Sequence, residues 1–244
     1  MISGGDRAEA TSDSGPYKWQ RAWTTLKTLI PKHIDNPATR LSEVQSQELF
    51  VSTSFKQVRN PIRIDVIGMV HGGPFEAPPN IDQEINASDK KVLALLDHLN
   101  QDSVGVEGSN CEQLTMDCFI RDVIRRVEMS YGFTPRKADV MQKVENSITG
   151  QPWIRYMKKH PKIPMAGLSD PIGLDELHGY LIELDLGGVN ERAVLDVRTD
   201  IGIARMIAFM KKRKLRHGVV LFGTRHVERA EALLRYMKIQ STTY

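Results

Sequence analysis

GVVLFGTRH, residues 218–226, is the stretch that most directly indicates the fold. The four apolar residues after Gly218 form a short run typical of a buried strand, and Gly223 punctuates its end. A helical pattern of apolar residues follows over residues 227–237. A strand followed by a helix is the repeating unit of sheets that are covered by helices.

Three other short apolar runs have the same appearance. They are residues 63–68 (RIDVIG), 103–107 (SVGVE) and 163–168 (IPMAGL). Between the four runs, longer patterns predict helices near residues 88–99, 111–130, 137–147, 173–184 and 190–212. The alternation predicts an α/β domain with a mostly parallel or mixed central β-sheet flanked by helices on both faces.

The residues before the first strand predict two further segments. Residues 1–16 are rich in Gly, Ser and Asp and predict a disordered tail. Residues 17–60 predict an N-terminal helical extension, in which Trp19 and Trp23 stand at helical spacing before Pro31 ends the first helix. The α/β domain is then expected over residues 61–244, in a chain whose oligomeric state is left open.

Composition excludes several classes of protein as first choices. With 41% hydrophobic and 26% charged residues, 244 residues can bury a core of normal size. The net charge is only +3, from 33 basic and 30 acidic residues, which gives no chain-wide field for nucleic acid or anionic membrane. No apolar run approaches the ~20 residues of a membrane helix. We therefore expect a cytoplasmic protein with no nucleic-acid or membrane partner.

The two cysteines, Cys111 and Cys118, lie within a predicted helix. Seven residues of helix would separate their Cα atoms by roughly 10 Å, which is too far for a disulfide. The sequence therefore predicts free thiols in a reducing compartment.

Titratable side chains follow or close all four predicted strands. They are His71, Glu107, Asp170 and His226. In open α/β sheets, ligands bind outside the carboxyl ends of the strands, where the loops converge. We therefore expect these four side chains to meet at one edge of the sheet.

Glycines precede both histidines by three residues, at Gly68 and Gly223. Each glycine is expected to take an unusual backbone conformation where its strand turns into a loop. Gly105 and Gly108 are expected to leave room beside Glu107 for a substrate or for a neighbouring backbone. Each Gly-x-x-His motif alone is weak, whereas a matched pair with an acidic strand end between is more specific.

Four stretches together resemble the TraB, Tiki and erythromycin-esterase superfamily. They are VIGMVHGG, SVGVEGSN, NERAVLDVRTDIGIARMI and VVLFGTRHVERAEALL, in that order over roughly residues 63–237. Motif histidines and glutamates line the site in that superfamily, and Tiki proteins are metal-dependent proteases. We expect the protein to have neither the secretory signal and membrane anchor of Tiki proteins nor the C-terminal membrane segments of the pheromone-shutdown branch, so the resemblance does not imply extracellular proteolysis.

The resemblance assigns roles by position. His71, Glu107 and His226 become candidate ligands of a divalent transition metal (Mn, Co or Zn), while Glu191 and Arg192 match the Glu-Arg pair that opens the family's long helix. Supporting positions are Gly68, Gly223, Arg225 and Asp170. Pro171 follows Asp170 where relatives of the TraB type commonly carry Arg, so this chain departs from the pattern there.

Each role has a structural alternative. The two histidines could bind metal and act near neutral pH, or only hydrogen-bond within loops. Glu107 could activate a water or simply face solvent. Glu191 could serve as a general base or only complement its helix dipole, and Arg192 could clamp a substrate carboxylate or pair with an acid.

The sequence therefore favours a metal-dependent hydrolase of the peptidase or esterase type, acting on a peptide or a small ester or amide. A histidine that activates water without metal is the enzymatic variant. The alternative of another class is a TraB-like regulatory or ligand-binding module that holds a peptide, a metal or haem without turnover, because fold analogy does not transfer activity.

Overall fold

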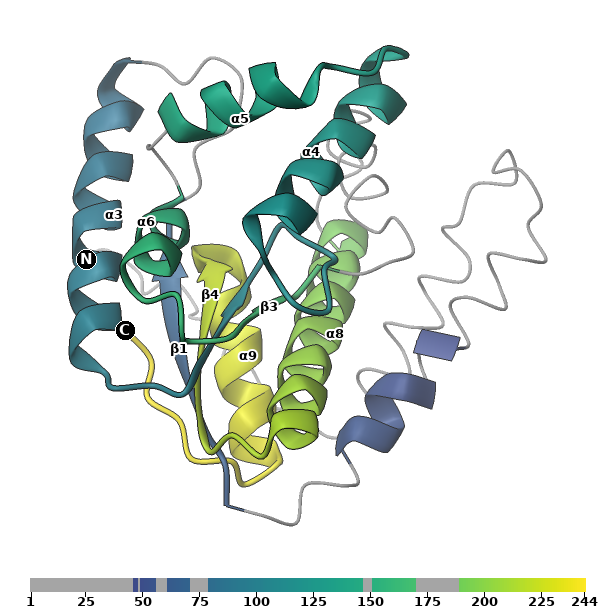
Figure 1. Cartoon of the computed structure of the whole chain (residues 1–244). Helices are drawn as coiled ribbons and strands as arrows, with labels where there is room; N and C mark the ends of the chain where they lie inside the picture. The colour runs from purple at the N-terminus through teal and green to yellow at the C-terminus, as the bar shows by residue number, and fades with distance from the viewer. Residues whose placement is uncertain (1–45, 48, 56–60, 71–78, 147–150, 170–188) are drawn as a thin grey trace, which may run out of the picture.

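A computed structural model describes residues 46–47, 49–55, 61–70, 79–146, 151–169 and 189–244 (Figure 1). Residues 1–45 and 173–184, with the predicted tail, most of the helical extension and one predicted helix, lie outside this part. Residues 46–47 and 49–55 are helical.

In the part of the chain that the structure describes, the sheet has four strands, all paired in parallel, in the order β1-β4-β2-β3. The strands are β1 (Arg63–Met69), β2 (Ser103–Val106), β3 (Met165–Gly167) and β4 (His217–Gly223). Each begins and ends within two residues of a predicted run. The α/β prediction is therefore confirmed, with a parallel sheet.

Helices connect the strands and cover the sheet. They are α3 (Pro79–His98), α4 (Met116–Tyr131), α5 (Lys137–Asn146), α6 (Pro152–Lys159), α8 (Val189–Arg213) and α9 (Thr224–Tyr236). The sequence did not predict α6, and it placed the start of α9 three residues late. The consequence is that His226 lies in the first turn of a helix.

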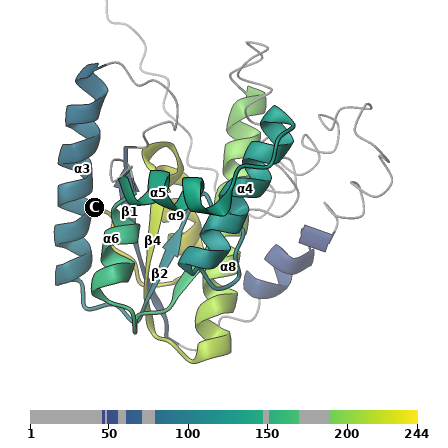
Figure 2. The same ribbon diagram turned by 45° about the horizontal axis from the view of Figure 1, so that its top comes forward.

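Alternation along the strands divides the core between the two faces of the sheet. Val220 and Phe222 of β4 pack with α8 and α9, whereas Val219 and Leu221 pack with α3, α4 and α6. Figures 1 and 2 show α3 and α8 on opposite sides of the strands. Both faces of the parallel sheet are thereby buried, as such sheets require.

The open edge of β1 is covered by the segment 240–244. The amides of Ile64 and Val66 donate to the carbonyls of Gln240 and Thr242, at 3.0 and 2.9 Å. The fully buried carboxylate of Asp65 accepts from the Thr242 amide at 2.9 Å. These bonds satisfy the groups that a strand edge would otherwise present to solvent.

The prediction of free cysteines is wrong. Cys111 and Cys118 form a disulfide, with their Cα atoms 6.2 Å apart. The helix begins at Met116, because the Thr115 side chain caps it by accepting from the Cys118 amide. Residues 111–115 are therefore a loop, which turns the two cysteines toward each other.

The expected backbone role of the motif glycines is also wrong. Gly68 does not have a positive φ, and Gly223 has φ −56° and ψ 146°, values open to any residue. Gly68 is instead required by close packing, since a Cβ there would lie 2.8 Å from Val227 Cγ2 of α9. Gly105 packs against Leu168 and Met206 in the core and leaves no space for substrate.

Candidate functional site

The carboxyl ends of the strands form the edge at which the candidate residues were predicted. β4 lies between β1 and β2, so the loops that follow these three strands are neighbours. His71 and Asp170 lie just outside the described residues. Glu107 and His226, 119 positions apart in the chain, can be placed.

Glu107 and His226 are in direct contact. Nε2 of His226 lies 2.8 Å from Oε1 of Glu107, and both side chains are nearly buried. Glu107 directly follows β2, while His226 lies in the first turn of α9, with its ring stacked on Phe222 at 5.3 Å. Two of the four predicted strand-end side chains therefore meet.

Two further groups hold the carboxylate of Glu107. Nη2 of Arg198, from α8, donates to Oε1 at 2.9 Å, and the Gly223 amide donates to Oε2 at 2.8 Å. Gly223 caps α9, so the carboxylate sits at the positive end of that helix dipole. The arrangement stabilises a negative charge on Glu107.

Thr199 determines how the protons are arranged on His226. The Thr199 hydroxyl donates to the Leu195 carbonyl at 2.7 Å and lies 2.7 Å from Nδ1 of His226. Since the hydroxyl has one proton, it accepts from an Nδ1–H group. One further proton then lies between Nε2 and the Glu107 carboxylate, so the two residues form a proton-sharing pair.

Glu191 and Arg192 lie at the start of α8 and take different partners. Glu191 forms an ion pair with Arg225 of α9, another predicted residue. Arg192 donates to Glu228 of α9 at 3.0 Å and lies 3.5 Å from Asp196. The guanidinium that donates to Glu107 belongs to Arg198, a residue further along α8.

A second buried ion pair lies next to this site. Arg229 of α9 donates to both carboxylate oxygens of Asp200, at 2.8 and 2.6 Å. Burial raises the pKa of Asp200, and the hydrogen bonds from Arg229 oppose that rise. Burial also raises the pKa of Asp196, one turn earlier, with Arg229 and Arg192 acting in opposition. The Arg229–Asp200 ion pair connects α9 to α8.

The described ligand candidates do not fit a metal ion in this arrangement. Glu107 Oε1 and His226 Nε2 face each other, and the Arg198 cation bonds to the same carboxylate oxygen. Within the described ranges, no three His, Cys, Asp or Glu side chains group in a way that could hold a metal. His71, the third predicted ligand, is outside these ranges, so metal binding stays a prediction.

A pocket of about 470 Å³ lies elsewhere, beside α8 and the end of β3. Its lining includes Gln47, Phe50, Asn110, Glu112, Arg205 and Phe209. None of the predicted site residues within the described ranges lines it. The loop that follows Glu107 contributes Asn110 to the wall of this pocket.

Comparisons with protein-family models, with curated proteins and with solved structures gave no match. The resemblance to the TraB and Tiki superfamily therefore depends on the motif residues alone. Among the helices of the described segments, none has the length and apolar character needed to cross a bilayer.

Sequence reasoning missed Arg198 and Thr199. Both lie in VLDVRTDIGI, where polar residues interrupt an otherwise apolar helical pattern. Thr199 and Asp200 are completely or almost completely buried. Because a buried polar side chain needs a partner, such interruptions of a core helix could have indicated residues that serve a site.

Proposed function

We propose that the protein is a hydrolase of peptide or ester bonds, with Glu107 and His226 as its acid–base pair. The observation that carries this proposal is the 2.8 Å contact between Glu107 Oε1 and His226 Nε2 at the carboxyl end of a parallel sheet. Sites at this edge are where open α/β sheets bind their ligands. Paired groups that share a proton can accept and return one during hydrolysis.

In the proposed reaction, Glu107 takes a proton from the attacking water and returns it to the leaving group. Glu107 is the more exposed of the pair, at 11% against 5% for His226. His226 is a positioning residue, since it contacts Glu107 and is itself oriented by Thr199. Bound substrate and water would replace part of the Glu107 hydrogen bonding, because catalytic contacts rearrange when the complex forms.

Arg198 supplies the fixed positive charge of this mechanism. Its guanidinium, 2.9 Å from Glu107, carries donors that could also reach the oxygen of a reacting carbonyl. From its place beside the base, the guanidinium would stabilise the negative charge that develops on this carbonyl oxygen as water attacks. This role takes no step through a metal ion.

One observation favours the alternative of a binding or regulatory module without turnover. Both ring nitrogens of His226 and both carboxylate oxygens of Glu107 have protein partners. A network satisfied in this way also stabilises the meeting point of β2, β4, α8 and α9. Under this alternative, ligands would bind near the pair without being cleaved.

The test is turnover of fluorogenic peptides and p-nitrophenyl esters by wild type, Glu107→Gln and Glu231→Gln. Glu231 is an exposed residue of α9 that pairs with Arg235, so its variant controls for the same chemical change outside the site. We expect Glu107→Gln to lose about 100-fold or more in kcat/KM, the usual contribution of acid–base catalysis. The control should keep the wild-type rate.

Absence of turnover by folded wild type, or equal rates in Glu107→Gln and wild type, would refute the acid–base proposal. Each rate is measured before and after treatment with a chelator. Loss on chelation, with recovery on adding zinc, manganese or cobalt, would assign the metal-dependent form of the hydrolase. Retention of activity supports the form without metal.

A further inference from the structure

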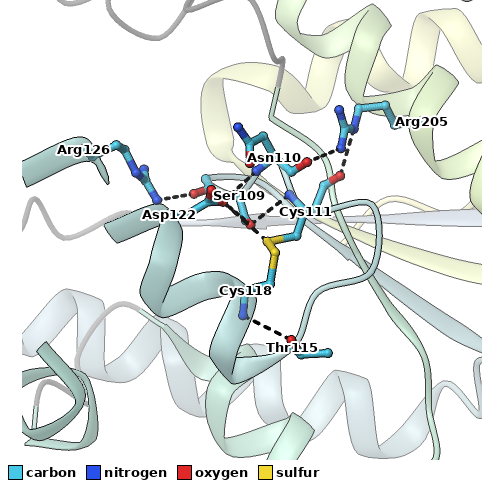
Figure 3. The surroundings of a disulfide bond; sticks show 10 residues. Ser109, Asn110, Cys111, Thr115, Cys118, Asp122, Arg126 and Arg205 are labelled. Carbon is cyan, nitrogen blue, oxygen red and sulfur yellow. Dashed lines mark hydrogen bonds between the residues drawn. A yellow bond between two sulfur atoms is a disulfide. The ribbon is translucent and has the colours of Figure 1, made fainter. Parts of the chain in front are cut away.

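The disulfide lies directly after Glu107 in the chain. Cys111 is four residues beyond Glu107, and Cys118 is in the first turn of α4. Cys111 is buried, whereas Cys118 is partly exposed. Figure 3 shows the bond joining the loop 107–111 to the helix. A reagent in solution can therefore approach this bond from the side of Cys118.

One stripe of α4 holds the whole of this loop. Cys118, Asp122 and Arg126 follow one another at steps of four residues, which places them on the same face of the helix. Each contacts a different part of the loop 107–111, and the contacts approach Glu107 as the helix proceeds (Figure 3). The disulfide is the covalent member of this series.

The two noncovalent members bond to the loop next to Glu107. Oδ2 of Asp122 accepts from the Ser109 hydroxyl at 2.7 Å and from the Asn110 amide at 3.1 Å. Arg126 donates to the carbonyl of Gly108, the residue that follows Glu107. Gly108 has φ 90°, a conformation that other residues rarely adopt. The loop therefore keeps its shape through α4.

The other side of the loop is bonded to β3. The Gly167 amide donates to the Cys111 carbonyl at 2.8 Å, and the Ser169 amide donates to the Ser109 carbonyl at 2.9 Å. Nε of Arg205 donates to the Gly167 carbonyl at 3.0 Å. Cys111 is thus held by β3 as well as by the disulfide, so loss of the disulfide frees Cys118 and α4 first.

We propose that the Cys111–Cys118 disulfide is a reducible site that controls the position of Glu107. Reduction would release the start of α4 and weaken the hydrogen bonds that Asp122 accepts from Ser109 and Asn110. The new thiol of Cys111 would also face Oδ2 of Asp122, 3.6 Å from its sulfur, and compete with Ser109 for that oxygen. The effect on turnover rests on the proposed function, while the structural effect does not.

The co-reactant is a dithiol reductant. One of its thiolates attacks Sγ of Cys118, the S–S bond breaks, and Cys111 leaves as a thiolate that takes up a proton. The second thiol of the reductant then attacks the mixed disulfide at the sulfur of the reductant and releases Cys118 as a thiol. The reductant loses two electrons and becomes a disulfide, while the protein gains two electrons and two protons.

The test is amide hydrogen exchange, measured by NMR on oxidised protein and on protein reduced with dithiothreitol. The Asn110 amide reports on Asp122, and the Gly223 amide reports on Glu107. The Ile64 amide, bonded at the far edge of the sheet, is the reference. We expect reduction to speed exchange at Asn110 and Gly223 by tenfold or more, with less than a twofold change at Ile64.

The double variant Cys111→Ser, Cys118→Ser is the matched control. It should exchange at the rate of reduced wild type and should not respond to dithiothreitol. Should it fail to fold, the comparison of oxidised with reduced wild type decides alone.

The proposal is overturned if oxidised protein contains two free thiols, if reduction leaves all these amides unchanged, or if it changes them equally. Turnover is measured on the same samples. Absence of turnover in both redox states counts against the hydrolase only, whereas unchanged exchange counts against the redox site only.

Discussion

Replacing Thr199 by Val tests the hydrogen-bond arrangement of the site through protein stability. Valine has nearly the same shape but no hydroxyl, so Nδ1–H of His226 would be buried without a partner. Thr199 is fully buried, which prevents water from taking its place. Leaving a buried donor unsatisfied costs about 1–3 kcal/mol, so we expect a loss of about 2 kcal/mol. For a chain of this size that loss lowers Tm by about 4–8 °C.

The assay is urea unfolding followed by far-ultraviolet circular dichroism, with Thr199→Ser as the control. Serine keeps the hydroxyl and loses one methyl group, which costs about 1 kcal/mol. The denaturant slope should be the same for all three proteins. Finding Thr199→Val as stable as wild type, or more stable than Thr199→Ser, would refute the reasoning that the hydroxyl accepts from His226.

Three other changes have defined outcomes. Cys111→Ser with Cys118→Ser removes a loop closure of eight residues, and urea unfolding should show a loss of about 2.5 kcal/mol relative to oxidised wild type. Gly167→Ala puts a Cβ 2.4 Å from the Ser109 carbonyl oxygen, and thermal unfolding should show a loss of about 2 kcal/mol; a wild-type Tm would contradict this close approach. Burial raises the pKa of Asp196, so its contribution to stability is present at low pH and is lost as pH rises through the folded-state pKa. Asp196→Asn should therefore be more stable than wild type at pH 7 and lose this advantage in acid, as measured by unfolding at both pH values.

The strands could be predicted from sequence because their residues are locally distinctive. Short β-branched runs bounded by glycine, such as residues 218–222, are buried on both sides of a parallel sheet and therefore contain few polar residues. Parallel strands also end at one edge, which is why Glu107 and His226 could be expected to meet. The strand order itself depends on tertiary packing and was not predicted.

The failures have identifiable physical causes. The sequence pattern predicted a helix from residue 111, whereas the helix begins at Met116, after the cap at Thr115. The disulfide was therefore excluded by a helical spacing that residues 111–115 do not have. Gly68 was interpreted as a turn residue, although its constraint comes from Val227 on a helix that follows 156 residues later. Contacts between distant segments of this kind leave no mark on the local sequence pattern.

The most direct test of the central claim is nitrogen NMR of the His226 ring in wild type and in Glu107→Gln. If Glu107 and His226 share a proton, the Nδ1 signal should show a bound proton in both proteins. The Nε2 signal should move on substitution, because the partner of Nε2 changes from a carboxylate to an amide. A ring whose signals are those of a solvent-exposed histidine, and are identical in both proteins, would contradict the acid–base pair.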